Sequence, residues 1–430
     1  MKPSISALAA AFLLAVFATA ADAQPSCSTV ARGGQLDPDG QFYSNTFRSE
    51  VAINSAGNAM FVARPYGARD KLYFYPSAGA AQVIARADGP APNGGTFRSQ
   101  RAFLSLSVND LDDLAFSAHL VSGDGVFLRD GGVLEAAAMR SQAAPSGGVF
   151  EAFPMVGAID AASRVPFVAR IAGGADGAFV YDSSTDVLAS LVLDGAATLD
   201  GRQICSIQAV DLGTGSFATI RASSKLICSD ASEVARNGIF IVTGLGISTV
   251  ALDGDAAPIG GSVFARFLDT PRINASNDIA FRAKTGGTTK TDGVFVWDFA
   301  TDTITTAVRK GDAVPVVGGS VAANQSFAFD DAGDVILNAK IAASSARFGI
   351  LKFGAVDSTL LVKTDAPPSD VFGPGSTFVR FSTLDGTSPD GNRFALQVRV
   401  TDTAPPSAKG AVIRCAGSPS GAFIDGAMFF

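Results

Sequence analysis

The feature that most constrains this chain is a turn signature that recurs seven times, with starts separated by 51 to 63 residues. Each copy opens with Asn, Asp or Ser, and most copies continue into two apolar residues a few positions later. The copies begin at Asn54, Asn109, Asp160, Asp211, Asn274, Asp330 and Ser388. Side chains of Asn, Asp and Ser cap a type I turn, and Gly at the fourth position accepts the backbone geometry with which the chain leaves the turn. The signature therefore predicts a β-hairpin in every copy.

Two further strand patterns follow each hairpin. The third strand usually begins with Gly and continues with apolar residues, as at residues 125–128 and 293–296. A fourth strand is found in six copies, from residues 83–86 to residues 360–363. Four strands in a repeat of this length are typical of a propeller blade. We therefore predict an all-β fold, a seven-bladed β-propeller of four-stranded antiparallel blades.

The missing fourth strand is present at the other end of the chain. Residues 29–32 read Thr-Val-Ala-Arg, which resembles Val-Ile-Ala-Arg at residues 83–86. If this N-terminal strand completes the C-terminal blade, strand pairing closes the ring and leaves no free edge at the junction. A linear solenoid, the alternative, would need no such offset and would require capping repeats. The offset favours a closed ring.

Residues 1–23 have the pattern of a secretory signal peptide. Lys2 provides a positive start, residues 8–20 are apolar, and Ala-Asp-Ala at residues 21–23 is a small-residue cleavage site. The apolar run is short for a bilayer span, and polar sequence follows it. We expect an exported protein, periplasmic or extracellular. Its residues 24–430 should form a single propeller domain, with no membrane span after signal cleavage.

Composition excludes several classes of protein. The chain is 47% hydrophobic and 17% charged, which excludes intrinsic disorder because enough apolar material exists to form a core. Its net charge is −7 and it contains no run of Lys and Arg, which argues against nucleic acid and anionic membranes as partners. We expect a monomer that binds an unknown protein or glycan ligand.

The four cysteines allow the ring to be tested. Exported chains oxidise paired thiols, and four cysteines permit three pairings. In a blade the first and third strands run downward and the other two run upward, so Cys27 and Cys415 should both lie on the lower face. Cys205, expected in the linker that enters the fourth blade, and Cys228, in the loop after that blade's second strand, should both lie on the upper face. We predict disulfides Cys27–Cys415 and Cys205–Cys228; unpaired thiols or metal-ligand pairs are the alternatives.

The turn motif resembles that of a known family. Asn-x-x-Gly-x-x-Ala-Phe, best kept at residues 54–61, 109–116 and 274–281, is similar to the motif of a tandem-repeat family of secreted bacterial proteins. The linker at residues 311–319 is similar too. Residues 388–395 resemble the Ser-Pro-Asp-Gly turn of TolB-type propellers. These resemblances imply β-propeller-like repeats and no catalytic residue.

The chain offers little for histidine or cysteine chemistry. His119 is the only histidine, and the pattern puts it in a loop between second and third strands. A Ser-His or Cys-His device needs a base beside its nucleophile, and zinc or copper sites built on histidine need several. We interpret His119 as a solvated loop residue, with a catalytic base as the alternative. We predict no catalytic, cofactor-binding or metal-binding residue.

Carboxylates remain as candidates for acid–base chemistry, because propeller glycosidases use Asp and Glu that line the axial channel. Glu50, Glu151 and Asp269 are expected near the entrances of first strands. We interpret them as solvated residues of the upper rim. The alternative is a carbohydrate-active enzyme that uses carboxylates at the channel mouth.

Other polar and aromatic residues have structural interpretations. Calcium could be held by three acidic clusters, which we interpret as solvated turns because none has the spacing of an EF-hand or a nonapeptide calcium repeat. The clusters are Asp253 with Asp255, Asp110 with Asp112 and Asp113, and Asp330 with Asp331. Arg32, Arg86 and Arg309 recur on fourth strands, where charge discourages edge pairing. Trp297 is expected to pack within a third strand.

The expected upper-face loops differ between copies in length and character. They are residues 64–71, 118–125, 221–237, 284–292 and 399–409. Rigid scaffolds commonly place recognition on such loops. We therefore expect a binding or scaffold module that recognises a ligand or partner through these loops. The loop at 221–237, tethered through Cys228, is the predicted contact surface.

Overall fold

The computed structural model describes residues 26–92, 94–173, 176–314, 319–342, 348–354, 358–363, 377–381, 386–387, 391, 393–401 and 408–416. The predicted signal peptide, residues 1–23, lies outside these residues. The described elements are all β-strands. Within the same residues, no helix is long and apolar enough to cross a membrane.

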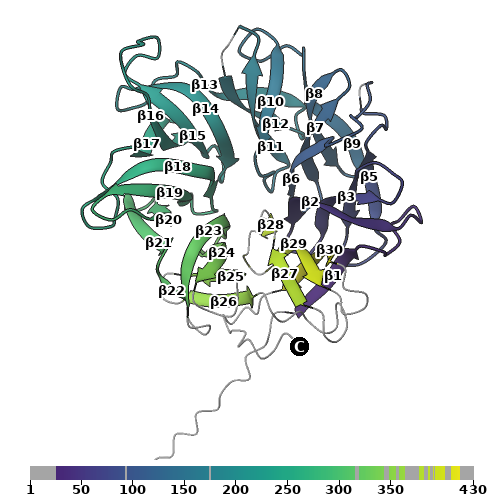
Figure 1. Ribbon diagram of the computed structural model, residues 1–430. Coiled ribbons are helices and arrows are strands. Elements are labelled where there is room, and N and C mark those ends of the chain that lie inside the picture. Colours follow the sequence, from purple (N-terminus) through teal and green to yellow (C-terminus); the bar gives the residue numbers. More distant parts are fainter. Residues whose placement is uncertain are drawn as a thin grey trace, which may run out of the picture.

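Seven antiparallel sheets stand around a central opening, which makes the fold the predicted seven-bladed propeller (Figure 1). Blade 1 contains β2 (Tyr43–Ile53), β3 (Ala59–Pro65), β4 (Lys71–Tyr75) and β5 (Gln82–Arg86). Blade 2 contains β6 (Phe103–Val108), β7 (Leu114–Leu120), β8 (Gly123–Asp130) and β9 (Val133–Met139). Blade 3 contains β10 (Phe150–Val156), β11 (Arg164–Ile171), β12 (Asp176–Asp182) and β13 (Val187–Leu193). Blade 4 contains β14 (Gln203–Leu212), β15 (Ala218–Lys225), β16 (Arg236–Thr243) and β17 (Gly246–Leu252).

The remaining blades continue the ring, and two of them carry a short additional strand. Blade 5 contains β18 (Ser262–Ile273), β19 (Ile279–Gly287), β20 (Asp292–Asp298) and β21 (Thr303–Arg309). Blade 6 contains β23 (Gly319–Phe329), β24 (Val335–Ala342), β25 (Phe348–Phe353) and β26 (Ser358–Lys363), with β22 (Ala313–Val314) beside β23. Blade 7 contains β27 (Thr377–Phe381), β29 (Arg393–Thr401), β30 (Ala408–Ala416) and β1 (Ser26–Arg32), with β28 (Gly386–Thr387) beside β29.

The N-terminal strand closes the ring, as the sequence predicts. β1 pairs antiparallel with β30, and the register sets Cys27 opposite Cys415. Their sulfur atoms form a disulfide that links residues 388 positions apart. The second predicted disulfide, Cys205–Cys228, is also present. Cys205 lies inside β14, however, and not in the linker before it, because the linker folds into a tight turn and pairing with β15 starts at Gln203.

The core of each blade is a repeated cluster of large apolar side chains. In four blades an aromatic residue of the second strand stacks on one of the third, with ring centroids 5.4 to 5.8 Å apart. The pairs are Phe61–Tyr73, Phe116–Phe127, Phe167–Phe179 and Phe281–Phe295. All of these side chains are fully buried. Burying each one stabilises the fold by about 1.5 to 3 kcal/mol, and the buried clusters join side chains of adjacent blades, as Met60 of blade 1 with Phe116 of blade 2.

The turn between the first two strands has the predicted capped geometry. The Oδ1 atom of Asn54 accepts a hydrogen bond from the backbone nitrogen of Asn58, at 2.9 Å. The fourth residue of the turn has a positive φ, 84° at Gly57 and 67° at Asp112. Asp211 does not open such a turn. It lies within β14, and the turn of blade 4 is instead formed by residues 213–217, closed by a hydrogen bond from the nitrogen of Gly213 to the carbonyl of Phe217.

Among the described residues, these turns connect neighbouring blades around the lower face; the predicted turn that opens at Ser388 lies outside them. Asn54 donates from Nδ2 to the carbonyl of Asn109 and to the carboxylate of Asp112, at 2.9 and 2.8 Å. Asn109 repeats this contact with the carbonyl of Asp160, at 3.0 Å. Across the closure, Arg393 of blade 7 donates to the carbonyl of Ala56. Asn suits this position in blades 1 and 2 because its oxygen caps its own turn while its amide group donates to the neighbouring blade.

Candidate functional site

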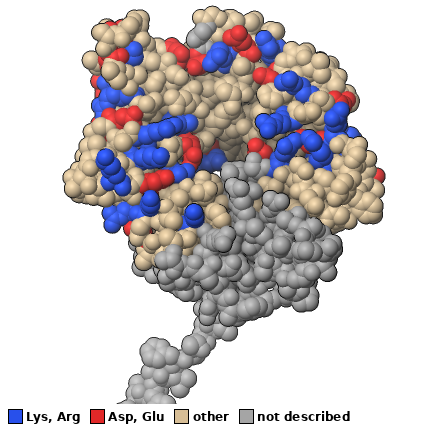
Figure 2. All heavy atoms as spheres, viewed as in Figure 1, with Lys and Arg blue, Asp and Glu red and all other residues tan. Residues whose placement is uncertain are grey.

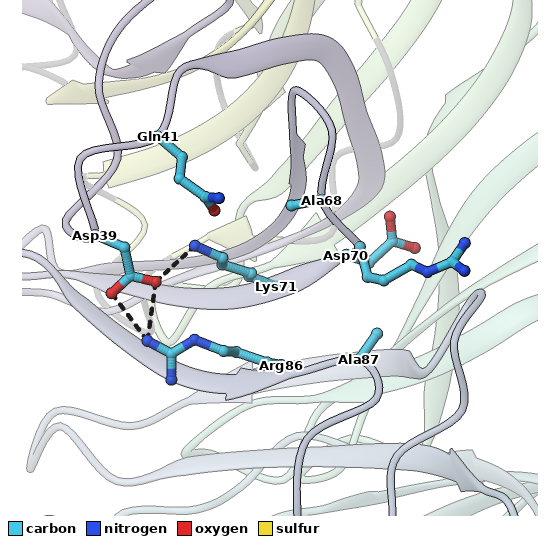
Figure 3. Close-up of a pocket in the computed structure, with 8 residues that line it drawn as sticks. Asp39, Gln41, Ala68, Asp70, Lys71, Arg86 and Ala87 are labelled. Carbon is cyan, nitrogen blue, oxygen red and sulfur yellow. Dashed lines mark hydrogen bonds and ion pairs between the residues drawn. The ribbon is translucent and has the colours of Figure 1, made fainter.

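A polar pocket opens on the upper face of blade 1, where the linker from β1 meets the loop between β3 and β4. Its volume is about 410 Å³. The lining residues are Asp39, Gln41, Ala68, Arg69, Asp70, Lys71, Arg86 and Ala87. Figure 3 shows Asp39, Gln41 and Lys71 converging from one side of this space. We call it the blade 1 pocket. It is formed in part by one of the upper-face loops, residues 64–71, on which recognition was expected.

A buried lysine joins the linker to the third strand at the base of the pocket. The Nζ atom of Lys71 lies 2.8 Å from Asp37 and 2.6 Å from Asp39, and its side chain is 7% exposed. Tyr73 donates its hydroxyl hydrogen bond to the same Asp37 oxygen, at 2.9 Å. Arg86 completes the cluster with contacts of 2.9 Å to both carboxylate oxygens of Asp39. These bonds fix the linker against the blade, so the pocket wall is pre-formed.

A second ion-pair cluster supports the opposite wall. Asp70 is buried, and its carboxylate forms ion pairs with Nη2 of Arg48, at 2.7 Å, and with Nε of Arg64, at 2.8 Å. Arg48 comes from the innermost strand, β2, and Arg64 from β3. Asp70 therefore ties the loop at residues 66–70 to two strands. Breaking a buried pair by removing one partner is costly because the other charge is left uncompensated.

The acids of the pocket are held in their ionised form. Burial raises the pKa of Asp37, but hydrogen bonds from Lys71, the Gln41 backbone and Tyr73 outweigh it and leave that pKa below its usual range. The hydrogen bond from Lys71 lowers the pKa of Asp39. Despite burial, Arg64 and Arg48 lower the pKa of Asp70. A general acid or base works best with a pKa near the operating pH. The pKa values of these three carboxylates are lowered, which moves them further from neutral pH.

The tyrosines behind the pocket keep their protons. Burial raises the pKa of Tyr43, and its hydroxyl bonds to that of Tyr75 at 2.8 Å. Burial and the hydrogen bond to Asp37 raise the pKa of Tyr73. The hydroxyls therefore remain hydrogen-bonding groups across the physiological pH range. The arrangement can present fixed charges and hydrogen-bonding groups to a polar ligand.

Two lining side chains remain available to a ligand. Gln41 is exposed, and its side chain has no hydrogen-bond partner among the described residues. Arg69 is 56% exposed and makes only a 3.3 Å contact with the equally exposed Asp88. Surface pairs of this kind contribute little to stability. Gln41 and Arg69 are therefore the residues of the pocket whose donors can turn to a bound molecule at small cost.

The structure does not bring the predicted rim carboxylates together. Glu50 lies well down β2 and not near its entrance, because β2 starts seven residues earlier, at Tyr43. Glu151 is the second residue of β10 and is exposed. Asp269 lies at an irregularity in β18, with φ of 50°, and pairs with Arg282 at 2.9 Å. The three residues belong to blades 1, 3 and 5, and no hydrogen bond or ion pair joins any two of them within the described part of the chain.

His119 is not a loop residue, contrary to the sequence interpretation. It lies in β7, where the register sets it opposite Asp124, and its Nδ1 atom is 2.7 Å from that carboxylate. β7 runs to Leu120 because the turn to β8 is very short. Arg170 and Asp176 are opposite each other at the corresponding position of blade 3, 3.4 Å apart. His119 therefore stands in blade 2 where blade 3 has the arginine of an arginine–aspartate pair.

The three acidic clusters considered for calcium are used by the protein itself. Asp112 accepts from Asn54 and Asp113 from Ser163. Asp255 binds Arg236, Asp253 binds Asn237, and Asp330 binds Lys352 at 3.0 Å. No group of three or more His, Cys, Asp or Glu among the described residues is arranged to hold a metal ion. Trp297 packs as expected, with its ring buried and Nε1 donating to Asp302.

The predicted contact loop is shorter than expected and firmly held. β15 extends to Lys225, so the loop spans residues 226–235. The disulfide Cys205–Cys228 anchors one side, and Glu233 accepts hydrogen bonds from the backbone nitrogens of Leu226 and Ile227. The loop exposes apolar side chains at its surface. They are Leu226, Ile227 and Val234, with exposures of 59%, 55% and 83%.

Family comparison identifies the chain. The model of the family of unknown function DUF7453 matches residues 9–177 and 128–395. The protein belongs to this family. The two overlapping matches, offset along the chain, are what a tandem repeat produces. A comparison with curated proteins found no match.

Several solved structures are similar to this chain at low sequence identity. An oligogalacturonate lyase in complex with manganese is 10% identical, with a TM-score of 0.49, over 93% of this chain and 99% of the other. The GH74 xyloglucanase from Xanthomonas campestris is 14% identical, with a TM-score of 0.44, over 87% of this chain and 53% of the other. A PL25 ulvan lyase is 10% identical, with a TM-score of 0.43, over 90% and 95%. At this identity the likenesses concern the fold alone.

Proposed function

We propose that this DUF7453 protein is a binding module that recognises a polar ligand, a glycan or a polar segment of a protein, at the blade 1 pocket. The observation that carries the proposal is the pre-formed pocket of about 410 Å³. Fixed charges at its base hold the walls in place, and the side chains of Gln41 and Arg69 are available at its mouth. Pre-organised polar groups lose little entropy when a ligand binds.

The protonation of the pocket supports binding over catalysis. The pKa values of Asp37, Asp39 and Asp70 are all lowered, so these residues do not store a proton at neutral pH. The second candidate remains a carbohydrate-active enzyme that uses Glu50, Glu151 or Asp269. Asp269 engages Arg282, and the three acids belong to different blades. This arrangement favours the first candidate.

We further infer that the protein works outside the cytoplasm as a monomer. The two disulfides fit an oxidising compartment, and the sequence of residues 1–23 predicts export. The resemblance of its turns to those of secreted tandem-repeat proteins and of TolB-type propellers supports the same view.

Ligand screening of residues 24–430, with both disulfides intact, tests the proposal. A glycan array and a peptide array identify the probe, and titration calorimetry then compares the variants Gln41→Ala and Arg69→Ala with the unaltered protein. Loss of one neutral hydrogen bond weakens binding by about two- to tenfold, and loss of one that involves a charged group by about tenfold or more. Arg69→Ala should therefore weaken binding more than Gln41→Ala. Arg309→Ala is the matched control, because Arg309 pairs with Asp312 at 2.9 Å in a different blade.

Two results would contradict the proposal. If the bound glycan is cleaved, and Glu151→Gln or Asp269→Asn abolishes cleavage, the protein is a carbohydrate-active enzyme and not a binding module. If Arg69→Ala and Arg309→Ala weaken binding equally, the blade 1 pocket is not the ligand site.

A further inference from the structure

Blades 4 and 5 carry an arginine at the same position of the repeat. Arg221 follows Ile220 in β15, and Arg282 follows Phe281 in β19, where Ile220 and Phe281 are the buried central residues of their second strands. Arg282 is fully engaged. Its guanidinium binds Asp292 through two nitrogens, at 2.9 and 2.7 Å, and Asp269 through the third, at 2.9 Å.

Blade 4 keeps the arginine but lacks the acid. The register sets Asn237 opposite Ser223 and Asp292 opposite Lys284, so Asn237 occupies in blade 4 the place that Asp292 occupies in blade 5. An Asn side chain carries no charge to neutralise an arginine. Asn237 is also turned elsewhere, since its Nδ2 atom donates to Asp253 at 3.0 Å.

Arg221 is consequently left without a partner. Its Nε atom is buried and has no hydrogen-bond partner, and no hydrogen bond or ion pair to its terminal nitrogens is present among the described residues. Of the three guanidinium nitrogens of Arg221, only Nε is both buried and without a hydrogen-bond partner. The two terminal nitrogens have no partner among the described residues either, so they must be accessible to solvent. Burial lowers the pKa of Arg221, and Arg266 lowers it further against the opposing effect of Asp269. A buried donor without an acceptor is destabilising, so Arg221 is not placed here by the demands of the fold.

The neighbouring strand adds positive charge to the same wall. Arg266 of β18 is exposed and lies directly opposite Lys284 of β19 in the register, although like charges in opposition are unfavourable. Asp269 is the nearby acid, and Arg282 already binds it. Figure 2 shows basic side chains gathered beside the central opening over β18 and β19. The wall therefore carries positive charge that the protein does not neutralise locally.

We propose that the channel wall between blades 4 and 5 is an anion-binding site, in which Arg221 and Arg266 hold a carboxylate or sulfate group of a ligand. A guanidinium binds such groups through two parallel hydrogen bonds. The protein's net charge of −7 makes a local site necessary, because the overall field repels anions. This site is separate from the blade 1 pocket and does not depend on it.

Titration calorimetry at low ionic strength tests the site on the mature protein with its disulfides intact. The probes are sodium sulfate, the carboxylated polymer alginate and the sulfated polymer dextran sulfate, with neutral dextran as the blank. We expect at least one anion to bind, and Arg221→Gln and Arg266→Gln each to weaken it by about tenfold. Arg309→Gln removes the same charge from the outermost strand of blade 5, where Arg309 pairs with Asp312, and should leave affinity within about twofold. If sulfate binds and the polymers do not, the ligand of the site is a free oxyanion. If only a polymer binds, the ligand is an extended anionic chain. Either result supports the site.

The free energy of unfolding measured without anion distinguishes an anion-binding role of Arg221 from a structural role. Without anion, Arg221→Gln should leave the free energy of unfolding unchanged or raise it, because a half-buried unpaired charge is removed. A larger loss of stability than Arg309→Gln causes would mean that Arg221 holds blades 4 and 5 together, and would overturn the proposal. The proposal also fails if no anion binds better than dextran, or if Arg221→Gln and Arg309→Gln weaken binding equally.

Discussion

The lower and upper faces of this propeller are built by different rules. On the lower face a similar capped turn recurs, and the side chains of Asn54 and Asn109 bind blade 1 to blade 2 and blade 2 to blade 3. On the upper face the corresponding positions diverge. Blade 1 has the ion-pair network of Lys71, blade 2 has a His119–Asp124 pair, and blade 4 has a disulfide-held loop. Repetition on one face and divergence on the other indicate that the lower face maintains the ring and the upper face is free to specialise.

The largest expected effect concerns the two disulfides, one on each face. In the chain-entropy model, a cross-link over 388 residues stabilises by about 6 kcal/mol, and one over 23 residues by about 3 kcal/mol. Cys27→Ser with Cys415→Ser should therefore lower the free energy of unfolding by about twice as much as Cys205→Ser with Cys228→Ser. Urea denaturation of the two double variants measures both values. If the two double variants lose equal free energies of unfolding, or if the Cys205 and Cys228 variant loses more, the pairing of β1 with β30 is enough to close the ring without the disulfide.

The inter-blade hydrogen bonds give the next effect. Asn54→Ala removes the cap of its own turn and two bonds to blade 2, so we expect a loss of about 2 to 3 kcal/mol. Asn274→Ala is the matched control, because Asn274 caps its turn but its Nδ2 atom contacts only Asp278, at 3.4 Å. Its loss should be about 1 kcal/mol. Thermal unfolding of both variants distinguishes the two contributions, and equal losses would leave the ring of turns without energetic importance.

The smallest effect is a change in pH dependence on the upper face. Burial raises the pKa of Asp194 to about 6, against the hydrogen bond from the Asp176 backbone, which lowers it, and with a smaller increase from the charge of Asp176. A carboxyl whose pKa is raised by folding binds its proton more tightly in the folded state, so stability falls as pH rises from about 4 through about 6. Asp194→Asn should remove this decline and raise the free energy of unfolding at pH 7 by about 1 kcal/mol.

Unfolding free energies measured between pH 4 and pH 7 test this expectation. Asp182→Asn is a suitable control, since hydrogen bonds from Ser184 lower the pKa of Asp182. That variant should not alter the slope in the same interval. A slope that persists in Asp194→Asn would mean that another group titrates there.

Some of the site could be predicted from the sequence and some could not. Cys27 and Cys415 were paired from strand direction alone, because a β-blade alternates direction strictly. The sequence pattern puts His119 in a loop, whereas it lies in β7, because the pattern does not show how short the turn between β7 and β8 is. The blade 1 pocket was missed, although Asp-Pro-Asp at residues 37–39 precedes a first strand, because its partner Lys71 lies more than thirty residues away.

The sequence by itself determined the number of blades, the order of strands within each and the strand that closes the ring, because hydrophobic alternation and turn residues are local and recur every 51 to 63 residues. Only the tertiary structure decided which side chains meet between repeats. Asn54 faces Asp112, Lys71 reaches Asp39, and Arg221 has lost the acid that Arg282 keeps. These contacts depend on how neighbouring blades are rotated and how each linker turns, and such geometry is set by packing across the whole ring and not by any local pattern.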